Sequence, residues 1–100
     1  MNTITLRKRA AKEYLEAIAW YKERSLLAAE NFVKEVNEAF IKIELEPAYY
    51  KNIYRIFYEI KLHRYPYSIV YFIDEGDSRI VISTIFHYKR NPKRKFDKRG

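Results

Sequence analysis

The sequence predicts an α+β domain with elements in the order β-α-α-β-β-β, an antiparallel sheet covered on one face by a helical hairpin. Three observations lead to this prediction: an alternating N-terminal stretch, two consecutive segments of helical periodicity, and three later segments with a period of two. One hundred residues suffice for a single domain with its own core. Cysteine is absent, which excludes a disulfide framework and a cysteine-based zinc site.

The N-terminal half is predicted to form a short strand and two helices. Residues 3–8 alternate apolar and polar side chains, as in a strand. After Ala10 the apolar stripe of a first helix contains Ala11, Tyr14, Leu15, Ile18 and Tyr21 or Lys22. Ser25 can cap a second helix, which Pro47 ends and whose stripe contains Phe32, Val36, Phe40 and Ile43. The very short connection favours an antiparallel hairpin.

The C-terminal half is predicted to form a three-stranded antiparallel meander. An aromatic connector at 48–54 precedes strands at 56–63, 67–74 and 79–88. The strand at 67–74 is apolar on both faces and should lie in the middle of the sheet. The sheet face away from the helices would then carry alternating aromatic and basic side chains, which makes it a candidate working surface.

The net charge of +7 is concentrated at the C-terminus. Residues 89–100 contain seven Lys or Arg and a single acid, Asp97, so the rest of the chain is nearly neutral. We therefore expect a folded domain at 1–92 and a basic tail at 93–100, with nucleic acid or an acidic protein as partner. The alternative is a tail that is merely solvated. We read no export signal and no membrane-spanning run, and expect a cytoplasmic protein.

Side chains suited to catalysis without a metal or cofactor gather near the C-terminus. His63 and His87 have no carboxylate pair at ligand spacing, and we find no phosphate loop or nucleophile motif, so we expect no metal and no cofactor. Metal-free RNA cleavage needs a base, an acid and cations at the phosphate. Suitable side chains are those of Lys61, Arg64, His87, Tyr88, Lys89 and Arg90. Alternatively, both histidines are simply half-exposed residues of the sheet.

Four segments match the motifs of one protein family, in its order and at its spacing. They are AWYKERS at 19–25, ENFVKEVNEAFIKIELEP at 30–47, YPYSIVYFI at 65–73 and HYKRNP at 87–92. The first two look like the end of the family's first helix and its second helix with the closing proline. The last two look like its central strand and the close of its last strand. Together they resemble the ParE/RelE superfamily of bacterial type II toxin-antitoxin toxins, over almost the whole chain.

The resemblance implies one of two activities. RelE-like and YoeB-like members cleave messenger RNA on the ribosome, whereas ParE-like members are thought to block DNA gyrase without nuclease residues. Ribonuclease members carry an arginine just before the aliphatic-Val-Tyr triplet of the central strand, and this position is Ser68 here. RelE-like members place a tyrosine six residues after the arginine that matches Arg90, and this position is Phe96. These two departures favour a gyrase inhibitor.

One feature favours the ribonuclease instead. The pair His87 and Tyr88 resembles the catalytic pair of YoeB-like members, with Arg90 as a neighbouring cation. In this alternative, Lys61 or Arg64 on the adjacent strand would replace the missing strand arginine.

The resemblance also implies a cognate antitoxin, whose acidic segment would suit this basic chain. Trp20 and Tyr21 are its candidate contacts if they are exposed; alternatively one of them packs in the core, which we favour for Trp20. The target would be DNA gyrase or, for the ribonuclease, the ribosome and its mRNA, and a relic that binds only its antitoxin is a third possibility. The candidate target or nucleic-acid contacts are Lys61, Arg64, Lys89, Arg90, Lys93 and Arg94.

Overall fold

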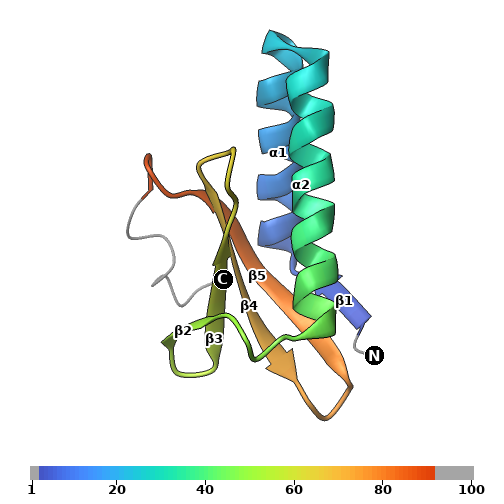
Figure 1. The fold of residues 1–100 in the computed structure, drawn as a ribbon, viewed down its shortest axis with the longest axis vertical. Helices are drawn as coiled ribbons and strands as arrows, with labels where there is room; N and C mark the ends of the chain where they lie inside the picture. Colours follow the sequence, from blue (N-terminus) through green and yellow to red (C-terminus); the bar gives the residue numbers. More distant parts are fainter. Residues whose placement is uncertain (1–2, 92–100) are drawn as a thin grey trace.

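The structure is a computed structural model, and it describes residues 3–91. The elements are β1 (Thr3–Leu6), α1 (Lys8–Arg24), α2 (Leu26–Leu45), β2 (Lys51–Tyr54), β3 (Phe57–Lys61), β4 (Tyr67–Asp74) and β5 (Arg79–His87). The two helices form a hairpin that covers one face of a five-stranded sheet and extends beyond it (Figure 1). The α+β class and the predicted order of elements are confirmed, with β2 as one additional strand. Neither of these helices is long and apolar enough to cross a membrane.

The strand order in the sheet is β1-β5-β4-β3-β2, so the apolar strand β4 lies in the middle as predicted. The last four strands pair antiparallel with their neighbours in sequence, whereas β1 pairs parallel with β5. The sheet is therefore mixed, and the prediction of a wholly antiparallel sheet is wrong for β1. A tight turn forces antiparallel pairing, but β1 reaches the edge beside β5 over a long connection, which permits a parallel pair.

Strand β2 lies within the segment that the sequence predicts as a connector. Lys51 pairs with Glu59, and Tyr54 pairs with Phe57 across a two-residue turn. A register shift after Asn52 interrupts the alternation of side chains along β2. This interruption explains why the period-two pattern of a strand does not show in the sequence there.

The core lies between the helical hairpin and the sheet. The residues that α2 buries in it are spaced by three and four: Ala29, Phe32, Val36, Ala39 and Ile43. The inward stripe of α1 runs through Ala10, Tyr14, Ala17 and Tyr21. Leu15 is predicted on this stripe but is 66 % exposed, because its side chain lies one position past Tyr14 and so outside the inward stripe.

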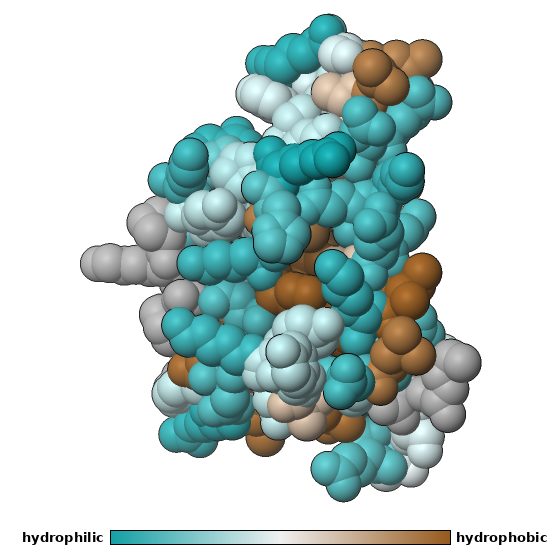
Figure 2. All heavy atoms as spheres, viewed as in Figure 1, coloured by the Kyte–Doolittle hydropathy of each residue, from teal (hydrophilic) through white to brown (hydrophobic). Residues whose placement is uncertain are grey.

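Ser25 alone separates the two helices. Its side-chain oxygen accepts a hydrogen bond of 3.1 Å from the N–H of Ala28, which satisfies a free donor at the start of α2. Its own N–H donates to the carbonyl of Tyr21, so the predicted cap is confirmed and also closes α1. This hairpin tip exposes Leu26 and Leu27, and Figure 2 shows apolar atoms at the tip, separated by hydrophilic side chains from further apolar groups lower on the same face.

Candidate functional site

The residues predicted for catalysis lie where β5 ends. His87, the last residue of β5, pairs with Tyr67, the first residue of β4, and their ring centroids lie 5.2 Å apart. The chain turns after Tyr88, and this brings Arg90 back to the strand end. Nη2 of Arg90 donates to Oη of Tyr67 at 3.1 Å, and the main-chain N–H of Arg90 donates to Nδ1 of His87 at 3.1 Å. His87, Arg90 and Tyr67 therefore form one connected group.

These hydrogen bonds define the protonation of the group. Because Nδ1 of His87 accepts a hydrogen bond, the proton of the neutral imidazole is on Nε2. Burial, followed by the charge of Arg90, lowers the pKa of His87 below its ordinary value of 6.5. Burial raises the pKa of Tyr67 above 10, although Arg90 opposes this shift. At pH 7 both rings are neutral, and Arg90 is the cation of the group.

Trp20 of α1 borders the same group. Its side chain is 39 % exposed, so the expectation that Trp20 packs in the core is wrong. The guanidinium carbons of Arg24 and Arg90 lie 3.6 Å and 5.5 Å from the indole centroid, and these cation–π contacts hold the indole at the surface. A cavity of about 330 Å³ lies between α1 and the end of β5, and its lining includes Glu16, Trp20, Tyr67, His87 and Arg90.

Tyr21, in contrast, packs inward. Its ring centroid lies 5.2 Å from that of Phe32, 4.9 Å from that of Tyr65 and 6.2 Å from that of Tyr67. Burial and the neighbouring phenols raise the pKa of Tyr21 to about 12. Tyr21 therefore supports the site from within an aromatic cluster, and Trp20 is the member of the pair that a partner can reach.

Tyr88 lies on the opposite face of the sheet from His87. Lys61 is in register with Ser68, and Ser68 with Phe86, so these three side chains share the face away from the helices. Adjacent residues of a strand alternate between faces, which places His87 on the helix side. The ring centroid of Tyr88 lies 5.1 Å from Nζ of Lys61. The sequence pair His87–Tyr88 is thus divided between the two faces of the sheet.

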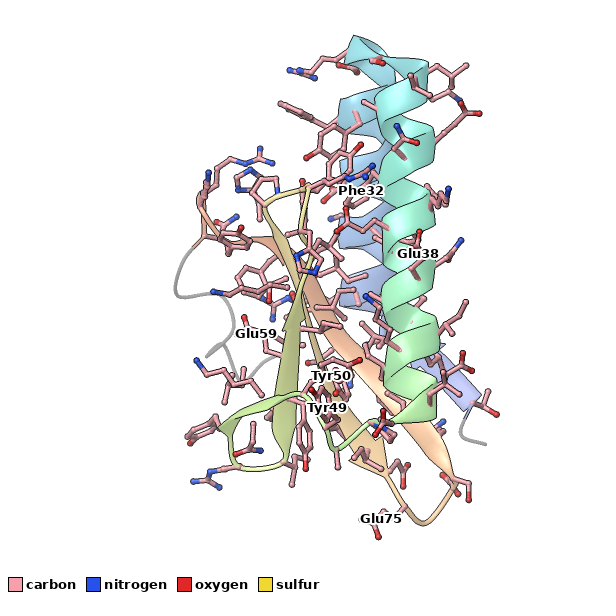
Figure 3. The ribbon with its side chains drawn as sticks, viewed as in Figure 1. Phe32, Glu38, Tyr49, Tyr50, Glu59 and Glu75 are labelled. Carbon is pink, nitrogen blue, oxygen red and sulfur yellow. The ribbon has the colours of Figure 1, made fainter. Side chains whose placement is uncertain are left out.

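Glu59 and Ser68 occupy the face away from the helices. They are 4 % and 0 % exposed, and Oγ of Ser68 donates to Oε2 of Glu59. Figure 3 shows Glu59 on the side of β3 that is turned away from the helices. At the position where ribonuclease members of the resembled family carry an arginine, this chain therefore has a buried serine bonded to a carboxylate.

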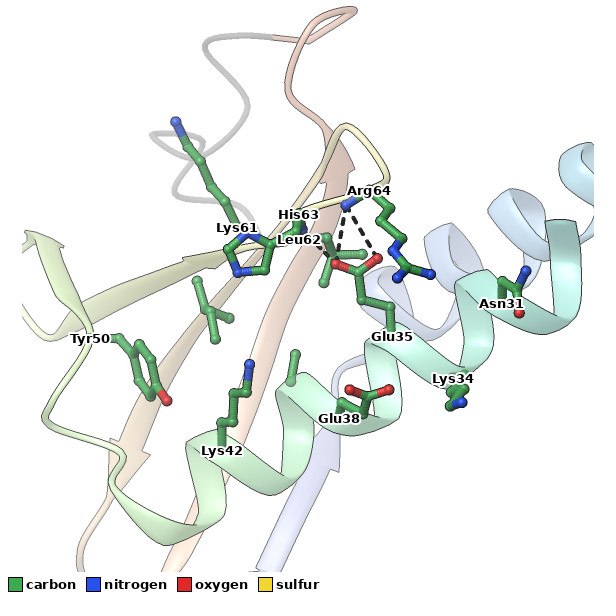
Figure 4. Close-up of a pocket in the computed structure, with 12 residues that line it drawn as sticks. Asn31, Lys34, Glu35, Glu38, Lys42, Tyr50, Lys61, Leu62, His63 and Arg64 are labelled. Carbon is green, nitrogen blue, oxygen red and sulfur yellow. Dashed lines mark hydrogen bonds between the residues drawn. The ribbon is translucent and has the colours of Figure 1, made fainter.

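A larger cavity, of about 630 Å³, lies between α2 and the end of β3 (Figure 4). The carboxylate of Glu35 accepts the N–H groups of His63 and Arg64 and so holds the β3–β4 connection against α2. Lys61 points away from α2, whereas Arg64 lies beside Glu35. These two predicted target contacts therefore point in different directions. The other charged residues of the lining are of both signs: Lys34, Glu38 and Lys42.

The remaining predicted contacts lie at and beyond the strand end. Lys89 and Arg90 are exposed just after β5. Lys93 and Arg94, with the predicted tail at 93–100, fall outside the residues that the structure describes and stay predictions. Within residues 3–91, no three His, Cys, Asp or Glu side chains are grouped so that they could hold a metal ion.

Sequence reasoning missed the acids that support the site. Oε1 of Glu13 accepts the hydroxyl of Thr84 at 2.6 Å and the N–H of Ile85 at 3.0 Å, where a register shift interrupts the β4–β5 pairing. On the helices, Glu13 and Glu35 have the spacing of ordinary solvated acids, and no local signal distinguishes them. Tyr67 could have been found, since it belongs to the YPY motif at the start of β4.

The chain matches the family model described as ParE toxin of type II toxin-antitoxin system, parDE, over residues 4–92. It is similar to the isolated E. coli RelE toxin, with a TM-score of 0.65 and 16% identity over 94% of this chain and 98% of that chain. A chain of the intact E. coli RelBE toxin-antitoxin complex gives a TM-score of 0.64 and 16% identity, covering 85% of this chain and 94% of that one.

A chain of the chromosomal ParDE system from P. aeruginosa gives a TM-score of 0.60 and 16% identity, covering 87% of this chain and 96% of that one. No curated protein matches the sequence. At such identities the structural likeness shows the fold alone, which RelE and ParDE chains share. The family model covers nearly the whole chain, and this protein therefore belongs to the ParE toxin family of type II toxin-antitoxin systems.

Proposed function

We propose that this toxin arrests growth by binding DNA gyrase, without turnover, and that a cognate antitoxin neutralises it. The fold does not favour this activity over ribosome-dependent RNA cleavage, because both RelE and ParDE chains are among its structural relatives. The proposal therefore depends on the side chains at the end of β5 and on the face of the sheet away from the helices.

The pair formed by Ser68 and Glu59 carries the proposal. The transition state of RNA cleavage bears negative charge, and a ribonuclease stabilises it with cations and hydrogen-bond donors. Here the serine replaces the arginine of ribonuclease members, and its hydroxyl already donates to a buried carboxylate. Loss of one such stabilising group costs about 2.7–4 kcal/mol, or roughly 10² to 10³ in rate.

The arrangement of His87 and Tyr88 supports the same conclusion. Acid and base must reach one phosphate together, but His87 faces Tyr67 on the helix side and Tyr88 faces Lys61 on the other. Nδ1 of His87 is occupied by the N–H of Arg90, so the lone pair that a general base needs is already engaged.

The ribonuclease remains the second candidate because one observation favours it. His87, Arg90 and Tyr67 are hydrogen-bonded into a single group beside a cavity, and they combine an imidazole, a guanidinium and a phenol. These are the side-chain types that metal-free RNA cleavage uses.

For the antitoxin, the exposed indole of Trp20 is the best-supported contact. Trp20 lies between the exposed tip of the helical hairpin and Arg90, so a partner could bury an aromatic anchor beside a cation. An acidic antitoxin segment would match the charge of this chain. The intact RelBE structure shows that a RelE toxin binds its antitoxin RelB.

Two assays with one purified toxin sample separate the candidates. We expect inhibition of supercoiling by DNA gyrase and intact mRNA on translating ribosomes. Cleaved mRNA together with unaffected gyrase would reject the proposal in favour of the ribonuclease.

The variants His87→Ala and Tyr88→Phe refine this comparison. A gyrase inhibitor should lose little activity in Tyr88→Phe, whereas a YoeB-like ribonuclease should lose most of its cleavage in both variants. Tyr49→Phe is a matched control, because Tyr49 is exposed and lies in the α2–β2 connection, outside the site. Binding to the co-expressed antitoxin checks that each variant is folded.

A further inference from the structure

The turn that joins β2 to β3 plays no part in the site described above, and its backbone is strained. The turn consists of Arg55 and Ile56, and Arg55 has φ 49°, a left-handed conformation that favours glycine or asparagine. Among residues 3–91, only Ser78 in the β4–β5 turn shares a positive φ without being glycine. Arg55 thus occupies a position where its backbone is disfavoured, and such strain often accompanies a functional side chain.

The Arg55 side chain is held in one orientation. Its Nε donates to Oη of Tyr54 at 3.0 Å, and its guanidinium carbon lies 5.2 Å from the centre of the same ring. Below the turn, Nδ2 of Asn52 donates to the carbonyls of Arg55 at 2.9 Å and Phe57 at 3.1 Å. These contacts fix the turn before any partner binds, which lowers the entropic cost of association.

The tip combines an apolar anchor with positive charge. Ile56 is 58 % exposed and follows Arg55 in the same turn, and the guanidinium of Arg55 lies over the ring of Tyr54. Residues 48–58 contain two cations and no acid. The β4–β5 turn is the reverse, since its charged residues are mostly acidic: Asp74, Glu75, Asp77 and Arg79. Figure 3 shows Glu75 at the tip of that second hairpin.

We propose that Tyr54, Arg55 and Ile56 form the surface through which the toxin binds its target, a protein with an apolar pocket bordered by carboxylates. Tyrosine and arginine dominate the energetics of protein interfaces, and the positive charge of this tip selects an acidic rim. The inference rests on the proposed function, in which the target is a protein. The tip lies at the opposite end of the sheet from His87, so this surface is separate from the Trp20 side of the molecule (Figure 1).

The variants Arg55→Gly and Ile56→Ala test this surface. Arg55→Gly removes the guanidinium and relieves the positive φ, so we expect it to fold at least as stably as the parent chain. The matched control is Ser78→Gly, which relieves the same kind of strain in the other hairpin. Growth arrest is measured in a host without the antitoxin, together with gyrase supercoiling, thermal stability and capture by the co-expressed antitoxin. We expect both tip variants to lose at least tenfold in potency and the control to lose nothing.

The outcomes separate this inference from the proposed function. If the parent chain arrests growth but spares gyrase, the gyrase proposal fails, while weakened arrest by both tip variants still supports the tip as the target surface. Full potency of both tip variants overturns the inference. A parent chain that arrests no growth also overturns it, and so does a loss of antitoxin capture in the tip variants that accompanies their loss of potency. Loss of potency in Arg55→Gly alone also overturns it, because a contact made by charge only would fit nucleic acid.

Discussion

Replacing Ser68 with alanine tests the polar contact on the face of the sheet away from the helices. Ser68 is 0 % exposed and donates to the carboxylate of Glu59, which is itself 4 % exposed, so water has little access to replace the lost donor. A hydrogen bond to a charged group contributes roughly 1.5–3 kcal/mol. For a domain of this size we therefore expect a decrease in Tm of about 10 °C.

Urea unfolding followed by Trp20 fluorescence and by circular dichroism measures this change in the free energy of unfolding. Ser83→Ala is the control, since Ser83 is also a buried serine of the sheet and lies outside the Ser68–Glu59 pair. Glu59→Gln and the double variant complete a cycle that isolates the coupling between the two side chains. A Ser68→Ala protein within about 0.5 kcal/mol of the parent, the range of ordinary surface substitutions, would refute the reasoning.

Three further predictions follow from caps and titrating groups. Ser25→Ala should destabilise the protein by about 1 kcal/mol and lower Tm by about 4–8 °C in a thermal melt, because the Ala28 N–H loses its acceptor. The pKa of Tyr21 is raised from 10 to about 12, so its contribution to stability is complete below pH 10 and lost as the pH rises towards 12. Between pH 9 and pH 11 the free energy of unfolding, measured by denaturation, should therefore fall less in Tyr21→Phe than in the parent chain. The pKa of His87 is lowered, so its contribution is present above pH 6.5 and lost in more acidic solution. Arg90→Ala should raise the NMR titration midpoint of His87, and an unchanged midpoint would contradict the role assigned to the Arg90 charge.

The helices and the central strand are predictable because their signals are local. Phe32, Val36 and Ile43 follow the helical period, and the cap at Ser25 lies where the first stripe stops. The alternation in β2 is broken by its register shift, so the strand is recognisable only from its pairing with β3. Leu15 shows a second limit, because several stripes fit a helix until the sheet decides which one faces inward.

The site is predictable in composition but not in arrangement. The sequence places His87, Tyr88 and Arg90 at the end of a strand, and the structure agrees on that position. Which face each side chain occupies depends on the register with β4, and the partner of Ser68 depends on the register with β3. Both registers are set by the pairing of one strand with the next, which the side-chain pattern within a single strand does not encode.

His87 and Tyr88 lie on opposite faces of the sheet, and this separation bears on function independently of the serine at position 68. The N–H of Tyr88 donates to the carbonyl of Pro66 at 2.9 Å, which extends the β4–β5 pairing by one residue past His87. For both side chains to reach a single phosphate, this hydrogen bond would have to break and the chain would have to twist. In the arrangement observed, the strand end instead presents two different surfaces, an imidazole and a guanidinium beside Trp20 on one side and Tyr88 with Lys61 on the other. Two separate surfaces suit a protein that binds partners, whereas a nuclease of the YoeB type needs the histidine and the tyrosine of its pair gathered on one.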